Sequence, residues 1–252
     1  MQHQLQVKET SEDLRQQYIE FVEIAAHDLQ APLRKLSVLT ERLTNKYAAP
    51  GNEDAQEYVQ RINTCIGDMR DLINGLSEFA SLNTDIIEPV ACDLDTFIKR
   101  ILHELETGIA EKNVRIEKTA LPVVDADKKQ IYQLFKKIVE NVFKFAKHHI
   151  PLTIHFQSHS LTPEEKLQHN LDTGRSYHKI EIEDNGIGFK QQYAEKIFHP
   201  LVRLNGKSGY PGVGLGLAMC EKIVRNHQGI IYGEGTENEG ARFTIILPEK
   251  LN

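Results

Sequence analysis

The feature that most constrains the fold is a change in hydrophobic periodicity after about residue 80. Before it, apolar residues recur three or four positions apart in two runs, at 14–47 and 59–79, as one face of an α-helix requires. Pro50 and Gly51 lie between the two runs, and both oppose continuation of a helix. Residues 1–80 are therefore predicted to form two long helices joined by a short turn.

A helical hairpin of this kind buries only one side of each helix and leaves an apolar seam. A second copy of the chain can cover that seam and complete a four-helix bundle. The packing requirement thus predicts a homodimer. In the alternative interpretation, the C-terminal half of the same chain covers the seam.

From about residue 92 the pattern becomes that of an α+β domain. Asp93 and Asp127 can each cap a helix, the first running to about Glu111 and the second to Phe145. A third helix is predicted at about 214–226, and the polar stretch 161–175 is predicted as a surface loop. Short apolar or period-two segments predict strands at 114–118, 121–124, 152–157, 177–184, 230–234 and 241–248. Antiparallel strands with helices on one face describe an α+β two-layer sandwich.

The two patterns meet in a segment that has neither. Residues 81–91 lose the helical period and contain Pro89, so they are predicted to be a linker. The predicted organisation is a helical hairpin at 1–80, the linker at 81–91, and an α+β domain at 92–252.

Composition excludes several classes of protein. The 252 residues carry a formal net charge of −6 with both signs interleaved, which argues against nucleic acid as a partner. No apolar run approaches the ~20 residues that cross a bilayer, so we expect no membrane segment and a cytoplasmic location, as a complete protein or as the cytoplasmic part of a longer sensor. Three widely spaced cysteines predict neither a disulfide framework nor a zinc site, and each is expected to be a small buried apolar residue: Cys65, Cys92 and Cys220.

His27 and Asp28 form the first candidate for chemistry. At ~100° per helical residue, His27 lies ~200° from both Ala25 and Leu29 and is therefore opposite the apolar stripe. A hydrogen bond from one ring nitrogen to Asp28 would fix the tautomer and make the other nitrogen more nucleophilic. Alone, the pair is more typical of a solvated surface histidine, since the chain has 11 histidines.

Three further segments carry residues suited to an anionic ligand. Asp184 closes a predicted strand and precedes two glycines, a pattern also found in ordinary tight turns. A glycine-rich stretch at 209–217 runs into a helix, where free N–H groups favour an anion, although a plain hinge reads the same way. On the helix after Asp127, positions three and four apart share a face. That face carries Asn141, Lys144 and Phe145.

The order and spacing of these segments carry more information than each segment alone. His27 with Pro32, then Asn141-xx-Lys144-Phe145, Asp184-x-Gly186-x-Gly188, Ile197-Phe198 and Gly212-x-Gly214-Leu215-Gly216-Leu217 resemble the H, N, G1, F and G2 boxes of sensor histidine kinases. The resemblance covers residues 15 to 248. The segments HDLQAPLRKL and YPGVGLGLAMCEKIV are most similar to the bacteriophytochrome-related branch.

The resemblance implies a dimeric phosphotransfer hairpin followed by a Bergerat-type (GHKL) ATP-binding domain. It also implies autophosphorylation from ATP with Mg²⁺, and transfer of the phosphoryl group to the receiver domain of a response regulator. In this reading His27 is the phosphoacceptor oriented or deprotonated by Asp28, Asn141 ligates Mg²⁺, and an upstream sensor domain lies outside this chain. The implied ATP-binding residues are Asn141, Lys144, Phe145, Asp184, Gly186, Gly188, Arg203, Lys207, Gly212, Gly214, Leu215 and Gly216.

Three positions depart from the family pattern. Lys137 stands where a second asparagine is usual, one turn before Asn141, and can either replace it as a charge or weaken Mg²⁺ binding. Ala31 lies four residues after the histidine and cannot orient a water, which predicts weak or absent phosphatase activity. Leu201 replaces an aromatic residue of the F box.

Two other classes of function compete with the kinase. An ATPase of the gyrase or Hsp90 type needs a glutamate where Lys137 stands, and a lysine cannot activate water as that base does. A non-phosphorylating module that binds nucleotide, dimerises and relays signals is the second alternative, and Lys137 is its only support in the sequence.

Overall fold

The computed structural model describes residues 29–30, 33–44, 53–82, 88–105, 114–204, 210 and 212–251, with the side chains of 53–55 excepted. Its contacts divide the chain into two compact units, Met1–Asp85 and Ile86–Asn252. Among the described residues, no helix is both long and apolar enough to span a bilayer. Each unit is described by itself.

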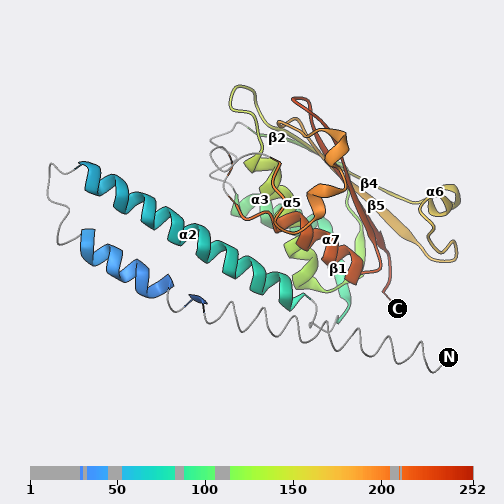
Figure 1. Ribbon diagram of the computed structural model, residues 1–252. Coiled ribbons are helices and arrows are strands. Elements are labelled where there is room, and N and C mark those ends of the chain that lie inside the picture. Colours follow the sequence, from blue (N-terminus) through green and yellow to red (C-terminus); the bar gives the residue numbers. More distant parts are fainter. Residues whose placement is uncertain are drawn as a thin grey trace. The chain divides into compact units, whose positions relative to one another are not determined.

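The first unit is a pair of antiparallel helices (Figure 1). Residues 33–44 are helical and pack against α2 (Glu53–Ser81). The Gln30 amide donates to Asn74 (3.3 Å), and Arg70 donates to Ser37 (3.1 Å). Residue 30 thus pairs with residue 74 and residue 37 with residue 70, so the two helices run antiparallel. This pairing confirms the predicted helical hairpin.

The contact between the two helices buries only part of their apolar surface. Leu33, Ile66 and Ile73 form a buried cluster. Other large apolar side chains on both helices are between two-fifths and two-thirds exposed, and monomeric soluble proteins rarely leave large apolar patches open to water. These exposed residues are Leu29, Leu36, Val38, Leu39, Leu43, Tyr58, Ile62 and Met69. The homodimer stays a prediction, and this surface supports it.

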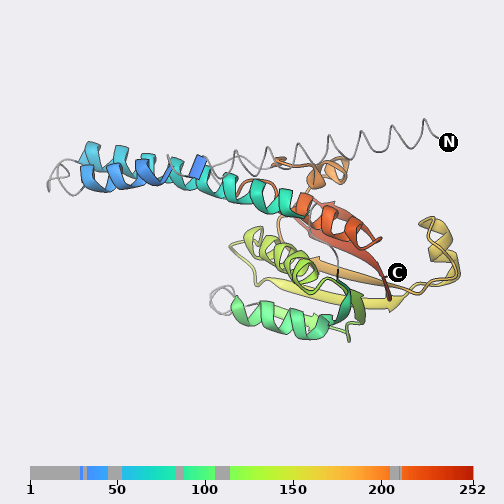
Figure 2. The ribbon, with the colours of Figure 1, turned by 90° about the horizontal axis from the view of Figure 1, so that it is seen from below.

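The second unit is an α+β sandwich. Three main helices, α3 (Leu94–Glu104), α5 (Lys128–Lys144) and α7 (Gly216–Asn226), lie together against a five-stranded sheet of order β2-β4-β5-β7-β6 (Figures 1 and 2). The sheet strands are β2 (Arg115–Lys118), β4 (Thr153–Ser160), β5 (Tyr177–Asp184), β6 (Ile230–Thr236) and β7 (Gly240–Pro248). Only β2 and β4 run parallel, and the other pairs are antiparallel. The predicted fold class is confirmed.

The core fills the space between the helices and one face of the sheet. Alternate residues of β4 and β5 point inward, among them Ile154, Phe156, Ile180 and Ile182, all fully buried. The helices contribute apolar stripes at helical spacing. Their fully buried members include Leu94, Ile98, Ile101, Ile131, Leu134, Phe135, Ile138, Val139 and Ile223.

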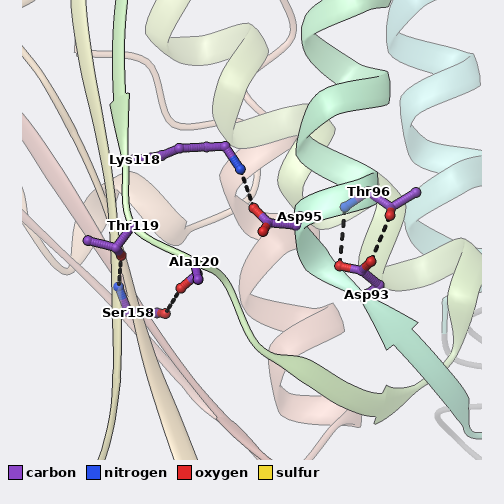
Figure 3. A network of polar contacts seen from close by, with 7 residues as sticks. All are labelled: Asp93, Asp95, Thr96, Lys118, Thr119, Ala120 and Ser158. Carbon is purple, nitrogen blue, oxygen red and sulfur yellow. Dashed lines mark hydrogen bonds and ion pairs between the residues drawn. The ribbon is translucent and has the colours of Figure 1, made fainter.

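The predicted caps start two of the helices. Asp93 accepts from the Thr96 N–H and hydroxyl, and Asp127 accepts from the Gln130 N–H at 2.8 Å. Figure 3 shows that Asp95 in the first turn of α3 also pairs with Lys118 of β2. In the same view, the Ser158 hydroxyl of β4 donates to the Ala120 carbonyl oxygen (2.8 Å), and the Ser158 N–H donates to Thr119 Oγ1 (3.2 Å). Cap and strand contacts together hold α3 beside this edge of the sheet.

Three predicted elements differ most from the structure. A strand, β1 (Val90–Asp93), begins in the last two residues of the predicted linker 81–91 and pairs with β3 (Val123–Ala126), a distant partner that no local pattern reveals. The helix begun by Asp93 ends at Glu104 and not near Glu111, because Leu105 leaves the helical conformation. The predicted loop 161–175 contains α6 (Pro163–Gln168), which a Thr162/Glu165 capping box stabilises.

The cysteine prediction is partly wrong. Cys92 and Cys220 are buried, as expected, but Cys65 is exposed on α2. It lies ~100° around α2 from Ile66, outside the buried cluster of Leu33, Ile66 and Ile73. A residue type that is usually buried therefore did not indicate which side of the helix it occupies.

His227 joins the C-terminal end of α7 to the N-terminal end of α5. Its Nδ1 lies 2.7 Å from the Ile223 carbonyl oxygen and must donate, and its Nε2 accepts from the Asp127 N–H at 3.0 Å. These two bonds use the neutral imidazole fully. The side chain is only 1% exposed, and burial lowers the pKa of His227, an effect that the Ile223 carbonyl and the Asp127 charge partly oppose.

The His227 contacts make the stability of the second unit pH-dependent. Because the folded-state pKa is below the unfolded value near 6.5, the unfolded state binds the proton first, and the contribution of His227 is present above that value and is lost as pH falls below it. We expect His227→Gln to cost about 1–2 kcal/mol at pH 7.5 through the imperfect replacement of two buried hydrogen bonds. The difference from wild type should shrink towards pH 5.5.

Hydrogen exchange of the α5 amides in the full chain measures this difference. The exposed His148→Gln serves as the matched control and should give no pH-dependent difference. A His227→Gln penalty that is constant between pH 7.5 and 5.5 would contradict the assignment.

Candidate functional site

The site is organised by the antiparallel packing of α7 along α5. At one end, the Asn226 amide donates to Gln130 Oε1 (3.2 Å), beside the His227 contact already described. In the middle, Cys220 Sγ donates to the Leu134 carbonyl oxygen at 3.7 Å. At the other end, Lys144 Nζ reaches Gly212, since a β-carbon built there would lie 2.8 Å from it. The C-terminal half of α5 therefore faces the glycine-rich segment that leads into α7.

The opposite side of α5 is occupied by α3. Glu104 accepts from the Tyr132 hydroxyl (2.6 Å), from Lys136 Nζ (2.9 Å) and from Arg100 Nε (3.2 Å). These bonds lower the pKa of the Glu104 carboxyl to about 2, with the Tyr132 hydroxyl first among them. Tyr132 also lies edge-on to Phe97. Packing of α3 fixes the rotation of α5 and leaves the Asn141 side for the site.

Asp184 ends β5 in a buried position. It is 8% exposed, and its Oδ1 accepts from the Gly186 N–H at 2.7 Å. Burial raises the pKa of Asp184 to about 6, although hydrogen bonds from the Gly186 and Ala241 N–H groups oppose the rise. A carboxylate held in this way keeps acceptor capacity for a further donor.

The turn after Asp184 needs its glycines because of close backbone contacts. Gly188 has φ +59°, and a β-carbon there would lie 2.0 Å from the Thr236 carbonyl oxygen. At Gly186 it would lie 2.6 Å from both Asp184 Oδ1 and the Phe145 carbonyl oxygen. That carbonyl accepts from the Ile187 N–H at 3.0 Å, so the turn is attached to the end of α5.

The glycine-rich segment before α7 is also constrained. Gly212 and Gly214 have φ +130° and +81°, a region that favours glycine. The Gly214 carbonyl accepts from the Leu201 N–H (2.9 Å), and Leu201 itself has φ +64°, which strains a residue with a branched side chain. Gly216 has no positive φ and no atom within 4 Å of a built β-carbon, so its glycine is not required by the backbone.

An aromatic pair and two cations lie beside this segment. The rings of Phe145 and Tyr210 are 5.1 Å apart and tilted by 45°, and Lys144 Nζ lies 4.8 Å from the centre of the Phe145 ring. Arg203 donates to the Tyr210 carbonyl oxygen at 2.7 Å. Burial, and then the charge of Arg203, lower the pKa of Lys144, and two cations near one another can be stabilised by an anion.

The structure thus brings most of the predicted ATP-site residues to the C-terminal end of α5. Lys144 and Phe145 lie on that end, the Asp184 turn is bonded to it, and Gly212 and Arg203 lie close to Lys144. Leu215 is buried at the start of α7, where its side chain makes no capping hydrogen bond. His27, Asp28 and Lys207 lie outside the described residues, as do Ala31 and Pro32.

Two residues of the site had no role in the sequence analysis. Tyr210, packed on Phe145, lies in the glycine-rich segment. The only feature of the sequence that could have indicated a role for it is that it is an aromatic residue among glycines. Gly240 has φ +149°, and a β-carbon there would lie 1.9 Å from the Asp184 carbonyl oxygen. A single glycine between Glu239 and Ala241 does not indicate from the sequence that the backbone here packs against Asp184.

Comparison with known families assigns both units. Residues 126–251 match the family described as histidine kinase-, DNA gyrase B-, and HSP90-like ATPase, which is half of the chain. Residues 17–85 match the His Kinase A (phospho-acceptor) domain.

Relatives of known name cover nearly the whole chain. Phytochrome-like protein Cph1 of Synechocystis sp. is 31% identical over 228 residues, which are 90% of this chain and 29% of that protein. Alginate biosynthesis sensor protein KinB of Pseudomonas aeruginosa is 28% identical over 236 residues, 91% of this chain and 36% of that protein. The chain therefore spans about three-tenths of the phytochrome-like relative. A phytochrome relative agrees with the branch that the sequence indicated.

Solved structures share the fold at low identity. Full-length ShkA in complex with AMPPNP has a TM-score of 0.65 and 18% identity, covering 91% of this chain and 45% of that one. Histidine kinase ThkA in complex with response regulator protein TrrA has a TM-score of 0.60 and 18% identity, covering 96% and 66%.

A phospho-acceptor hairpin followed by a sandwich of the ATPase type defines the class of protein-histidine kinases. The chain belongs to the sensor histidine kinases of two-component systems. The resemblance stated from the sequence is confirmed.

Two glycines of the site should differ sharply in their tolerance of alanine. Gly188→Ala places a β-carbon against the Thr236 and Gly240 carbonyl oxygens at positive φ, and we expect it to lower the free energy of unfolding by about 2–4 kcal/mol. Gly216→Ala meets no atom and should be neutral or slightly stabilising. Urea denaturation followed by circular dichroism measures both. Equal effects of the two substitutions would contradict this account of the turn.

Proposed function

We propose that this chain is an ATP-dependent protein-histidine kinase that phosphorylates itself on His27 and passes the phosphoryl group to an aspartate of a response regulator. The observation that carries the proposal is the grouping of Lys144, Phe145, Asp184 and Gly212 at the end of α5. The grouping occurs in a chain whose first unit matches the phospho-acceptor domain.

The nucleotide base is assigned to the Asp184 side of the site. A buried carboxylate that can accept a further hydrogen bond suits the amino group of adenine, because the bond gains strength away from water. Phe145, beside Tyr210, offers an apolar surface to the base. Gly186 and Gly188 shape the turn that leaves room for it.

The triphosphate is assigned to the other side. Lys144 and Arg203 supply positive charge. We assign the same role to Lys207, which the sequence places four residues after Arg203. The first N–H groups of α7 have no side-chain cap, and Gly212, Gly214, Leu215 and Gly216 lead into them, so the helix start can bind phosphate oxygens.

Asn141 fits a Mg²⁺ ion bound together with the phosphates. Its amide supplies one hard oxygen ligand on the site-facing side of α5, and Mg²⁺ typically takes one or two protein ligands with phosphate oxygens and water. When bound, the ion would neutralise charge on the β- and γ-phosphates.

Phosphoryl transfer needs alignment and charge neutralisation more than acid–base chemistry. A ring nitrogen of His27 donates its lone pair to the γ-phosphorus as the bond from that phosphorus to the bridging oxygen breaks, and ADP leaves with the electron pair. Asp28 holds or accepts the proton of the second ring nitrogen, which keeps the attacking nitrogen unprotonated.

The partners follow from the same proposal. The exposed apolar residues of the helical unit fit a homodimer that forms a four-helix bundle. The related kinase ThkA forms a complex with a response regulator protein, which supports a receiver domain as the second partner. Since the phytochrome-like relative is much longer, we assign this chain to the cytoplasmic, signal-transmitting part of such a protein.

The rival functions are less well supported. Lys137, on α5, cannot activate water in place of the glutamate of a gyrase-type ATPase. A relay module that binds nucleotide without phosphorylating accounts for the second unit. It does not explain why the first unit matches a phospho-acceptor domain.

Labelling with γ-³²P-ATP and Mg²⁺ tests the proposal. We expect acid-labile, alkali-stable label on the wild-type chain and its complete loss in His27→Ala. His148→Ala, at an exposed histidine of the second unit, should keep the label. ATP binding without any label in the wild type would contradict the kinase and favour the relay module.

Asp184 gives a separate test of the nucleotide site. Asp184→Asn should weaken ATP binding at least tenfold at pH 7.5, the cost of a lost charge-assisted hydrogen bond. Because the pKa of Asp184 is about 6, wild-type affinity should fall more steeply between pH 7 and 5.5 than that of the variant, which lacks this carboxylate and retains only the response of the phosphate itself.

Calorimetry measures these affinities, and Glu183→Gln is the matched control. Glu183 is the neighbouring carboxylate, half-exposed and paired with Arg242 at 2.7 Å. If both variants lost ATP affinity equally, Asp184 would have no specific contact with the base.

A further inference from the structure

Lys137 lies on the side of α5 that faces α7 and the glycine-rich segment. Three contacts define that side of α5. Gln130 contacts Asn226, the Leu134 carbonyl oxygen contacts Cys220, and Lys144 contacts Gly212. At ~100° per residue, Lys137 is ~60° around the helix from Leu134 and only ~20° from Lys144. Along the helix it lies between these two contacts, so it shares their face.

Its immediate neighbour points elsewhere. Lys136 lies ~100° further round the helix, where it pairs with Glu104 of α3 at 2.9 Å. The two adjacent lysines therefore belong to different surfaces of the molecule. They carry the same charge, and both side chains are partly exposed.

The charge of Lys137 also acts on Cys220 of α7. Burial raises the pKa of the Cys220 thiol, and the charge of Lys137 is the strongest influence opposing that rise. The charge of Glu140 acts on the same thiol with the smallest of the effects. Cys220 lies one turn after the N-terminal residue of α7, Gly216.

We infer that Lys137 is a polyphosphate-binding residue that supplies part of the positive charge for which this site otherwise needs Mg²⁺. The inference rests on the proposed nucleotide site and extends it. Lys137 lies one turn before Asn141 on the same face, with Lys144 one turn beyond, so three polar side chains of α5 share the face that reaches Gly212 at Lys144. Lys137, Lys144 and Arg203 are then three cations on the side of the site where α7 begins without a side-chain cap.

The consequence is a nucleotide site with a reduced need for the ion. A lysine is a compact charge that can contact a phosphate oxygen directly, whereas an amide contributes to binding an anion only through a metal or a neutral hydrogen bond. The chain should therefore bind ATP in the absence of divalent cations more tightly than a Lys137→Asn variant does. Binding of adenosine, which has no phosphate, should not depend on Lys137.

Calorimetric titration of the full chain with ATP and with adenosine, each in EDTA and in Mg²⁺, tests the inference. We expect Lys137→Met and Lys137→Asn to weaken binding of ATP in EDTA about tenfold, the value of one charge-assisted contact, and to leave adenosine binding unchanged. Lys137→Asn should show a larger gain from Mg²⁺ than the wild type. Lys136→Met, which removes the same charge from the α3 side, should match the wild type in every titration.

Each other outcome has a definite meaning. Unchanged ATP affinity of Lys137→Met in EDTA would overturn the inference, as would an equal loss for ATP and adenosine, because that loss indicates a role in packing only. Failure of the wild type to bind ATP in either condition would instead overturn the proposed nucleotide site itself.

Discussion

The antiparallel register of α5 and α7 is the constraint on which the site depends. The Asp127–His227 bond at one end and the Cys220–Leu134 bond in the middle fix which residues of the two helices lie opposite one another. Lys144 and Phe145, at the C-terminal end of α5, then meet the segment that enters α7. Because packed helices slide in discrete steps and not continuously, a change at the far end would displace the lysines and the glycines together.

Regular periodicity made most elements readable from the sequence, and non-local pairing explains the exceptions. α5 and β5 have buried faces with clear periods of 3.6 and 2, and their limits were predicted within a residue or two. β1 has only four residues and one buried side chain, so its identity comes from pairing with β3, about thirty residues away. α6 buries no side chain, and its capping box was the only local signal.

The candidate site was predictable as a set of residues but not as an arrangement. The spacing of Asn141, Lys144 and Phe145 gives a shared helix face directly, because it follows from helix geometry. The approach of Gly240 to the Asp184 carbonyl and the packing of Tyr210 on Phe145 depend on strand order and on a loop path, which local sequence does not encode. The different surroundings of Lys136 and Lys137 likewise depend on the packing of α3 and α7 against different sides of α5.

The apolar residues left exposed on the helical hairpin have a consequence for how the whole chain unfolds. If a second copy covers Leu36, Leu39, Leu43, Ile62 and Met69, that burial is gained by association, and mass action then links folding to protein concentration. The sandwich has a closed core of its own and has no such link. Diluting the protein should therefore lower the melting temperature of the hairpin and leave that of the sandwich in place, separating one thermal transition into two.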